Sequence, residues 1–131
     1  MKLLLDTHIW LWSRGQPDRL TSSVVKALED PENELWLSPI SIWELVLLVE
    51  TGRIVLDIVV EDWVARAMQA VPLKEAAITY EVALETRRVQ LPHRDPVDRF
   101  LAATAKVFGF TLVTADERLL GAKGFSVFAN R

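Results

Sequence analysis

The sequence predicts an α/β sandwich around a parallel sheet, and three observations support this fold class. Short apolar runs, which have the length of buried strands, alternate with longer stretches of helical periodicity. The chain has 131 residues, which is the length of one ordinary domain. Half of these residues are hydrophobic, and a chain of this size buries enough surface to form a core. We therefore expect a single domain over residues 1–131.

Four short apolar runs are the predicted strands. They are Lys2–Leu5, Leu35–Leu37, Phe110–Thr114 and Phe125–Phe128. Asp6 stops the first run, Ser38 stops the second, and the third ends shortly before Asp116. Apolar runs of this length, closed by polar residues, are typical of strands buried in a sheet.

Helical patterns fill most of the segments between these runs. One helix is expected to begin at Thr7, and the others span Ser22–Glu29, Ile40–Glu50, Glu61–Ala70, Glu75–Arg88 and Val97–Phe108. In the last of these, apolar side chains recur on one stripe from Val97 to Phe108. Gly52 and Gly109 follow two of the helices, where a helix exit favours a left-handed residue.

Composition excludes several classes of protein. The chain has no cysteine, which rules out disulfides, thiolate zinc sites and a cysteine nucleophile. The five glycines form no phosphate-binding loop. His8 and His93 lack the spacing of a zinc helix, so we expect both to be structural or exposed. Asp6 interrupts the N-terminal apolar run, so we predict neither a secretory signal nor a membrane span, and we expect a cytoplasmic protein.

Acidic residues stand where a parallel α/β sheet binds its ligands, at the carboxyl ends of the strands. Asp6 follows the first predicted strand, Asp116 follows the third, and Asp98 lies in the first turn of the Val97–Phe108 helix. The net charge is −3, so charge alone would not attract a nucleic acid to this protein. We expect these acids to share one crevice.

Glu44 is a fourth candidate, because it lies in a helix that is apolar almost throughout. A carboxylate in such surroundings needs a cation or costs several kcal/mol in desolvation. The alternative is a capping box formed by Ser41 and Glu44. Ser38-Pro39 offers a competing helix start that would place Glu44 beyond reach of the cap.

Helix capping is an alternative role for several of these acids. Asp6 and Asp116 each stand where a carboxylate could cap the following helix, and the helix dipole alone would favour Asp98. Asp95 precedes Pro96 and is predicted to be an N-cap. Helix capping does not, however, require these acids to lie together at one edge of the sheet.

A cluster of carboxylates would need a cation. Two carboxylates about 5 Å apart repel by roughly 3 kcal/mol at an effective dielectric constant near 20. Oxygen ligands without histidine or cysteine favour a hard divalent ion, Mg²⁺ or Mn²⁺. Such an ion also joins an acidic protein to an anionic substrate, because it can neutralise a phosphate and activate a water.

Five stretches of the sequence resemble PIN-domain ribonucleases, in particular the toxins of VapBC toxin–antitoxin systems. They are LLLDTHIWLW (Leu3–Trp12), SPISIWELVLL (Ser38–Leu48), HRDPVDRFLAATA (His93–Ala105), TLVTADERL (Thr111–Leu119) and, more weakly, VPLKEAA (Val71–Ala77). The resemblance implies a three-layer α/β/α fold with a central parallel sheet. It also implies hydrolysis of RNA with Mg²⁺ or Mn²⁺.

Carried over position by position, the resemblance makes Asp6, Glu44, Asp98 and Asp116 the catalytic and metal-binding acids. The hydroxyls of Thr7 and Thr114 would hold these carboxylates or a metal water, and Arg94 and Arg99 would contact RNA. Water activated by one or two metal ions would attack the phosphodiester in line and leave 5′-phosphate and 3′-hydroxyl ends, with Asp98 relaying a proton.

The resemblance also implies partners. An antitoxin of the VapB type would cover the active-site groove, and we expect a homodimer. Six apolar side chains are candidates for lining the groove: Ile9, Trp10, Trp12, Trp43, Leu47 and Leu48. The alternatives are a housekeeping PIN nuclease without an antitoxin and a PIN fold that only binds partners. A phosphatase or phosphoacceptor is disfavoured, because His8 stands where the aspartyl phosphatases have the second acid of D-x-D.

Overall fold

The computed structural model describes residues 1–131, and a five-stranded parallel sheet forms its centre. The strands are β1 (Lys2–Leu5), β2 (Glu34–Leu37), β3 (Lys74–Glu75), β4 (Thr111–Thr114) and β5 (Ser126–Ala129). Their order across the sheet is β3-β2-β1-β4-β5, and every neighbouring pair is parallel. The predicted parallel sheet is therefore confirmed, with β1 in the middle.

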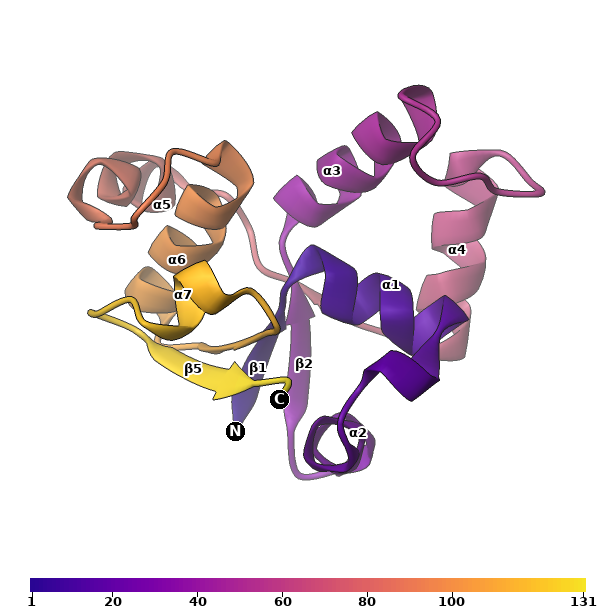
Figure 1. Cartoon of the computed structure of the whole chain (residues 1–131), viewed down its shortest axis with the longest axis horizontal. Helices are drawn as coiled ribbons and strands as arrows, with labels where there is room; N and C mark the ends of the chain where they lie inside the picture. The colour runs from indigo at the N-terminus through magenta and orange to yellow at the C-terminus, as the bar shows by residue number, and fades with distance from the viewer.

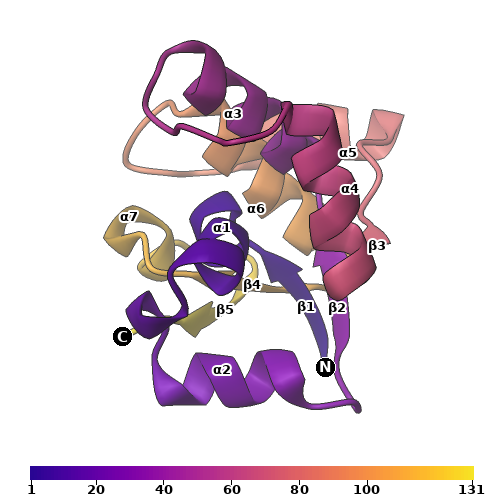
Figure 2. The ribbon, with the colours of Figure 1, turned by 90° about the vertical axis from the view of Figure 1, so that its right-hand side faces the viewer.

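Helices cover both faces of this sheet. They are α1 (Thr7–Gly15), α2 (Ser22–Glu29), α3 (Pro39–Glu50), α4 (Val60–Ala70), α5 (Tyr80–Glu85), α6 (Pro96–Phe108) and α7 (Glu117–Leu120). Two short 3-10 helices span Pro17–Arg19 and Thr86–Arg88. In Figure 1, α1 to α4 lie on the right of the sheet and α5 to α7 on the left, and Figure 2 shows α1, α2 and α4 from their own side. The three-layer α/β/α arrangement is confirmed.

Alternation along the strands decides which helices each face contacts. In β1, Leu3 and Leu5 belong to a core cluster that includes buried residues of α1, α2, α3 and α4. Leu4 points the other way, into a second cluster with Leu101 of α6 and Leu119 of α7. Successive side chains of a strand point to opposite faces, so three adjacent leucines supply both cores.

Local signals in the sequence set the starts and ends of the site helices. The Ser38 hydroxyl accepts the Ile40 N–H at 3.1 Å at the start of α3, and the Asp95 carboxylate accepts the Val97 N–H at 3.0 Å at the start of α6. A proline follows each cap at the first helical position. Gly109 ends α6 with φ = 70°, in the left-handed conformation.

The helix predicted over Glu75–Arg88 is confirmed only from Tyr80 onward, and its first residues are not helical. Lys74 and Glu75 instead form the edge strand β3, in register with Trp36 and Leu37 of β2. The helix α5 begins only at Tyr80, after the Thr79 hydroxyl has accepted the Val82 N–H at 3.1 Å. Pairing with an existing sheet edge overrides the helical pattern, because such pairing is a tertiary contact that local periodicity does not report.

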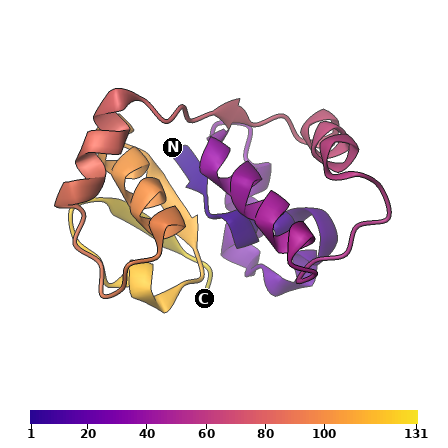
Figure 3. The ribbon, with the colours of Figure 1, turned by 90° about the horizontal axis from the view of Figure 1, so that it is seen from above.

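Three of the helices that form the site begin at the carboxyl ends of the strands. Residues directly after β1 enter α1, those after β2 enter α3, and those after β4 enter α7. Figure 3 looks onto this end of the molecule, with α3 in magenta and α6 in orange. None of the helices has both the length and the apolar character needed to cross a bilayer.

Candidate active site

All four predicted acids line one pocket at the carboxyl ends of the strands. The pocket has a volume of about 220 Å³. Its lining residues are Asp6, His8, Trp12, Glu44, Asp95, Asp98, Ala115, Asp116 and Arg118. The expected convergence of Asp6, Glu44, Asp98 and Asp116 is thus seen in the structure. We call this space the acid pocket.

Asp6 is held by a threonine from the neighbouring strand. The Thr114 hydroxyl donates to Asp6 Oδ2 at 2.6 Å and accepts the Asp116 N–H at 3.0 Å. Asp6 stands at the N-cap position of α1, yet its side chain makes no capping hydrogen bond. Its carboxylate therefore faces the pocket, and Thr114 occupies the supporting position that the resemblance implied.

Thr7 differs from the expectation. Its buried hydroxyl donates to the Ser41 hydroxyl at 2.8 Å, and no hydrogen bond joins it to a carboxylate. This contact ties the start of α1 to the first turn of α3. Thr7 fixes the spacing between the elements that carry Asp6 and Glu44, and so supports the site indirectly.

Glu44 makes no capping box. Ser38 caps α3, and the Ser41 hydroxyl is engaged with Thr7. The Glu44 carboxylate lines the acid pocket from a half-buried position on α3 and has no hydrogen-bonded partner in the structure. The alternative role weighed for this residue is therefore ruled out.

Asp98 is the most confined of the acids. Its side chain is 7% exposed, and its Oδ2 atom is buried without a hydrogen-bond partner. The His93 Nε2 atom lies 3.1 Å from this oxygen but is not aligned for a hydrogen bond. His93 thus contacts the site, which the expectation of a purely structural or exposed residue did not foresee.

The hydrogen bond at the other ring nitrogen fixes the tautomer of His93. The Asp95 N–H donates to His93 Nδ1 at 3.2 Å, so Nδ1 carries no hydrogen and the ring hydrogen is on Nε2. In this state Nε2 is a donor that faces Asp98 and is not available as a metal ligand. A ring nitrogen of His93 nevertheless lies within 4.8 Å of carboxylate oxygens of Asp98 and Asp116.

Asp116 is paired with an arginine of its own helix. It caps α7 by accepting the Arg118 N–H at 2.9 Å, and the Arg118 guanidinium donates to both of its oxygens, at 3.1 and 2.9 Å. The predicted capping alternative is therefore confirmed for Asp116. Capping and pocket lining coexist, as they do for Asp95.

Burial and neighbouring charges shift the pKa values of these acids in different directions. Desolvation raises the pKa of Asp6, and Glu44 adds to this effect against the Thr114 hydrogen bond and His8. Desolvation, together with the charges of Asp6, Asp95 and Asp116, raises the pKa of Asp98 to about 8. The Arg118 hydrogen bond instead lowers the pKa of Asp116.

These residues fit a divalent cation. Asp98 Oδ2 is an unpartnered buried acceptor, and the repulsion that raises the pKa of Asp98 is what a cation would remove. Asp98 and Asp116 each offer an oxygen within 4.8 Å of the other, and Asp6 and Glu44 line the same pocket. Oxygen donors of this kind suit Mg²⁺ or Mn²⁺, which keep several waters.

The two arginines predicted to contact RNA lie outside the acid pocket. Arg94 and Arg99 line a separate hollow of about 440 Å³. Arg94 is exposed, whereas the Arg99 guanidinium donates to the Thr86 carbonyl at 2.5 Å and so joins α6 to the segment after α5. The structure therefore places them together, beside the start of α6.

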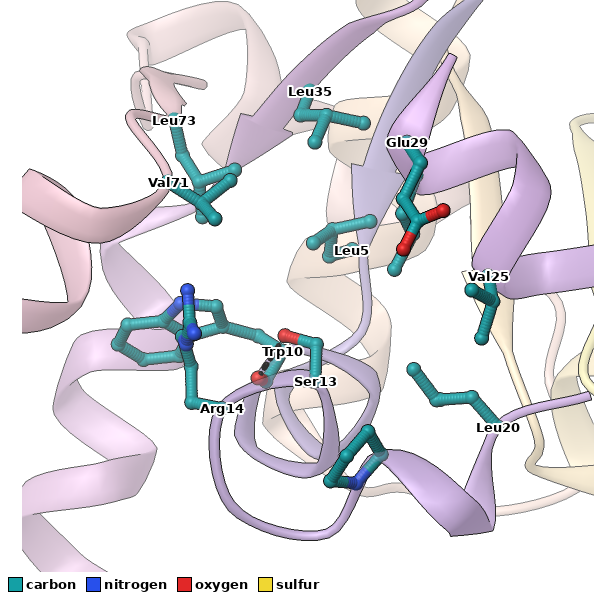
Figure 4. Close-up of a pocket in the computed structure, with 12 residues that line it drawn as sticks. Leu5, Trp10, Ser13, Arg14, Leu20, Val25, Glu29, Leu35, Val71 and Leu73 are labelled. Carbon is teal, nitrogen blue, oxygen red and sulfur yellow. Dashed lines mark hydrogen bonds between the residues drawn. The ribbon is translucent and has the colours of Figure 1, made fainter.

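A second pocket, of about 230 Å³, lies beneath α1 and is mostly apolar. We call it the apolar pocket. Figure 4 shows Leu5, Leu35 and Leu73 on one side of it and Trp10 and Leu20 on the other. Of the six apolar side chains considered for an exposed groove, Ile9 and Trp10 are buried in the core and are therefore not among those that line it. Trp43 and Leu47, in contrast, are 47% and 37% exposed on α3.

Sequence reasoning missed four members of the site, namely His8, His93, Arg118 and the pocket-lining role of Asp95. Each is within a few residues of a predicted acid. The signal that could have found Arg118 is its position two residues after Asp116, within reach of the cap. No local sequence feature indicates His93, because only the path of the loop before α6 brings this side chain next to Asp98.

Comparison with known proteins agrees with this architecture. The family model described as PIN domain matches residues 3–124. Ribonuclease VapC22 of Mycobacterium tuberculosis is 38% identical over 120 residues, which cover 89% of this chain and 88% of that protein. The relationship therefore extends over nearly the whole length of both proteins.

Solved structures share the fold at lower sequence identity. A chain of the VapBC2 structure from Rickettsia felis, bound to a promoter DNA fragment, has a TM-score of 0.74 and 15% identity. A chain of VapBC-1 from nontypeable Haemophilus influenzae has a TM-score of 0.67 and 14% identity. Both alignments cover 98% of each chain. From the family match, the 38% identity and the shared fold, it follows that the chain belongs to the PIN-domain family, as a relative of its VapC proteins.

Proposed function

We propose that residues 1–131 form a single PIN domain that acts as a metal-dependent endoribonuclease, the toxin of a type II toxin–antitoxin system in the cytoplasm. The observation that carries this proposal is the convergence of Asp6, Glu44, Asp98 and Asp116 on one pocket. The 38% identity to a protein named as a ribonuclease supports RNA as the substrate.

Asp6, Glu44, Asp98 and Asp116 line one pocket and would hold Mg²⁺ or Mn²⁺, directly or through its waters. The ion supplies positive charge that polarises water and neutralises the phosphate under attack. Thr114 keeps the Asp6 carboxylate fixed through its 2.6 Å hydrogen bond. In the metal-free protein the pKa of Asp98 is raised to about 8, so this carboxyl would release its proton to solvent when the cation binds.

RNA would be held by its phosphates beside this pocket. Arg94 and Arg99 stand next to the start of α6, which carries Asp98. Arg94 is free to contact phosphate, whereas Arg99 would have to give up its bond to the Thr86 carbonyl or share it. Removal of Arg94 should therefore weaken RNA binding more than removal of Arg99 at equal protein stability.

Incubating total RNA with the purified protein, with and without Mg²⁺ or Mn²⁺, tests the activity. Cleavage should require the ion and should leave 5′-phosphate and 3′-hydroxyl ends, which end mapping detects. The matched control is Glu44→Gln, which removes a charge from the pocket at equal side-chain volume. Cleavage that persists in excess EDTA, or in Glu44→Gln, would contradict the proposed mechanism.

Two kinds of partner are part of the proposal. The structural neighbours come from VapBC structures, which supports a small antitoxin of the VapB type as a partner. Exposed apolar residues gather on α3 and on the segment around α5, and such residues favour a protein interface, here a homodimer. They are Trp43, Leu47, Ile78, Tyr80 and Leu84.

Expression in a bacterial host tests the toxin assignment. The chain alone should arrest growth, and co-expression with the small protein encoded beside it should restore growth and yield a complex. Light scattering of the purified chain should give the mass of a dimer, and Trp43→Ser should shift it toward a monomer. Harmless expression of a protein that cuts RNA would favour a housekeeping nuclease, and folded protein without cleavage would favour a binding module.

A further inference from the structure

Arg118 lies across the opening of the acid pocket. Its Nη2 atom is 2.9 Å from Asp116 Oδ2 and 3.6 Å from Asp98 Oδ2, and its side chain is 51% exposed. The Nε atom donates to the other oxygen of Asp116 at 3.1 Å. One guanidinium therefore contacts the carboxylates of both Asp98 and Asp116, which each offer an oxygen within 4.8 Å of the other.

These are the same oxygens that a divalent cation would use. The orphaned Asp98 Oδ2 atom has no hydrogen-bond partner, and Arg118 is the only arginine or lysine among the residues that line the acid pocket. A divalent ion about 4 Å from a guanidinium is repelled by it, strongly so in a partly buried site. The guanidinium and the ion therefore cannot both bind these carboxylates tightly at the same time.

We propose that Arg118 is a built-in competitor of the metal: it bridges Asp98 and Asp116 in the metal-free protein and leaves them when the ion binds. This inference rests on the proposed function, because it assumes the metal site. The half-exposed side chain has room to swing outward, since only its pocket-facing edge is hydrogen-bonded. The Kd for the metal then depends on the difference between the binding free energies of the ion and of the guanidinium at the same carboxylates.

The alternative is that Arg118 only extends the cap of α7. A purely structural arginine would affect the stability of the short helix and leave metal binding unchanged. The chain offers a matched control, because Arg131 pairs with Glu117 of the same helix at 3.0 Å, and Arg131 does not line the acid pocket. Arg131→Gln removes the same charge and a comparable surface ion pair from α7.

Calorimetric titration of the full chain with Mn²⁺ tests the competition. In Arg118→Gln we expect the Kd for Mn²⁺ to fall about three- to tenfold, the range expected from releasing a charge-assisted pair that is half exposed. Arg131→Gln should leave the Kd within about twofold of the parent. An unchanged or raised Kd in Arg118→Gln would overturn the inference, while absence of Mn²⁺ binding in the parent would overturn the metal site and the inference together.

Nuclear magnetic resonance separates displacement from mere repulsion. The Nε–H signal of Arg118, assigned by its loss in Arg118→Gln, should be protected from exchange in the metal-free protein because it donates to Asp116. Saturating Mg²⁺ should abolish that protection and shift the signal. A signal that stays protected at saturating Mg²⁺ would show that the arginine remains in place, and the inference would be wrong even if the affinities differ.

Discussion

The acid pocket and the apolar pocket have nearly the same size, about 220 and 230 Å³, but opposite chemistry. Five acids line the first, and eight of the twelve residues that line the second are hydrophobic. Leu5 lines the apolar pocket, and the next residue, Asp6, lines the acid pocket. One step along the chain therefore separates a side chain that stabilises the fold from one that costs folding free energy.

The difference shows what each region contributes. Apolar side chains around the second pocket lower the free energy of the folded state by leaving water. In the acid pocket, burial and mutual repulsion raise the pKa values of Asp6 and Asp98, so their ionised forms destabilise the metal-free fold. A cluster that opposes folding is what the proposed cation site would require, and variants in the two regions should therefore have opposite effects on stability and activity.

The largest expected effect is loss of RNA cleavage in Asp98→Asn, by more than about 100-fold, because a charged ligand is removed at nearly constant volume. At pH 8 and above, where Asp98 is ionised, the melting temperature of the metal-free protein should rise, since repulsion in the acid pocket is relieved. Asp95→Asn is the matched control and should keep its activity, because asparagine caps α6 about as well as aspartate. Loss of cleavage in folded Asp95→Asn would mean that the catalytic role belongs to the other acid.

The apolar pocket should respond in the opposite way. Leu20 is 9% exposed and lines the apolar pocket but not the acid pocket. Leu20→Ala should therefore lower the free energy of unfolding by about 2–3 kcal/mol. Denaturant unfolding measures this loss. Cleavage per folded molecule at room temperature should stay within about twofold of the parent, and a larger drop would mean that the two regions are coupled.

Metal should stabilise the folded protein by binding at the acid pocket alone. An ion at about 100 times its Kd adds roughly 2.7 kcal/mol to the free energy of unfolding, which raises the melting temperature by several degrees. The shift, followed by thermal unfolding with Mg²⁺ or Mn²⁺, should shrink in Asp6→Asn and vanish with EDTA. In Leu20→Ala it should keep its full size, and a reduced shift there would contradict a local site.

A smaller effect concerns pH. The pKa of Asp98 is about 8 in the fold, against about 3.9 in an unfolded chain. Between these values only the folded state keeps the proton, so the stability of the metal-free protein should fall as pH rises from about 5 to 8. Melting curves in EDTA should show this slope, and Asp98→Asn should flatten it. An equal slope in both proteins would mean that Asp98 does not titrate there.

The sequence by itself determined four of the five strands, most of the helices and the four acids of the pocket. Strand ends and helix starts carry local signals, such as Asp6 after an apolar run or Asp95 before Pro96. In a parallel sheet these ends meet at one edge, so acids that are far apart in the chain can be placed together from the order of strands and helices alone. The confirmed Ser38 cap of α3 follows from the same local rules.

Tertiary structure alone decided how each of these groups is used. The edge strand at Lys74–Glu75 exists because β2 offers it partners, and Ile9 and Trp10 are buried because other helices cover them. His93 reaches Asp98 through the fold of its loop. Arg118 bridges Asp98 and Asp116 only because α6 and α7 start beside each other. Periodicity and caps report contacts within a few residues, whereas the distance between two charges from separate elements depends on how those elements pack.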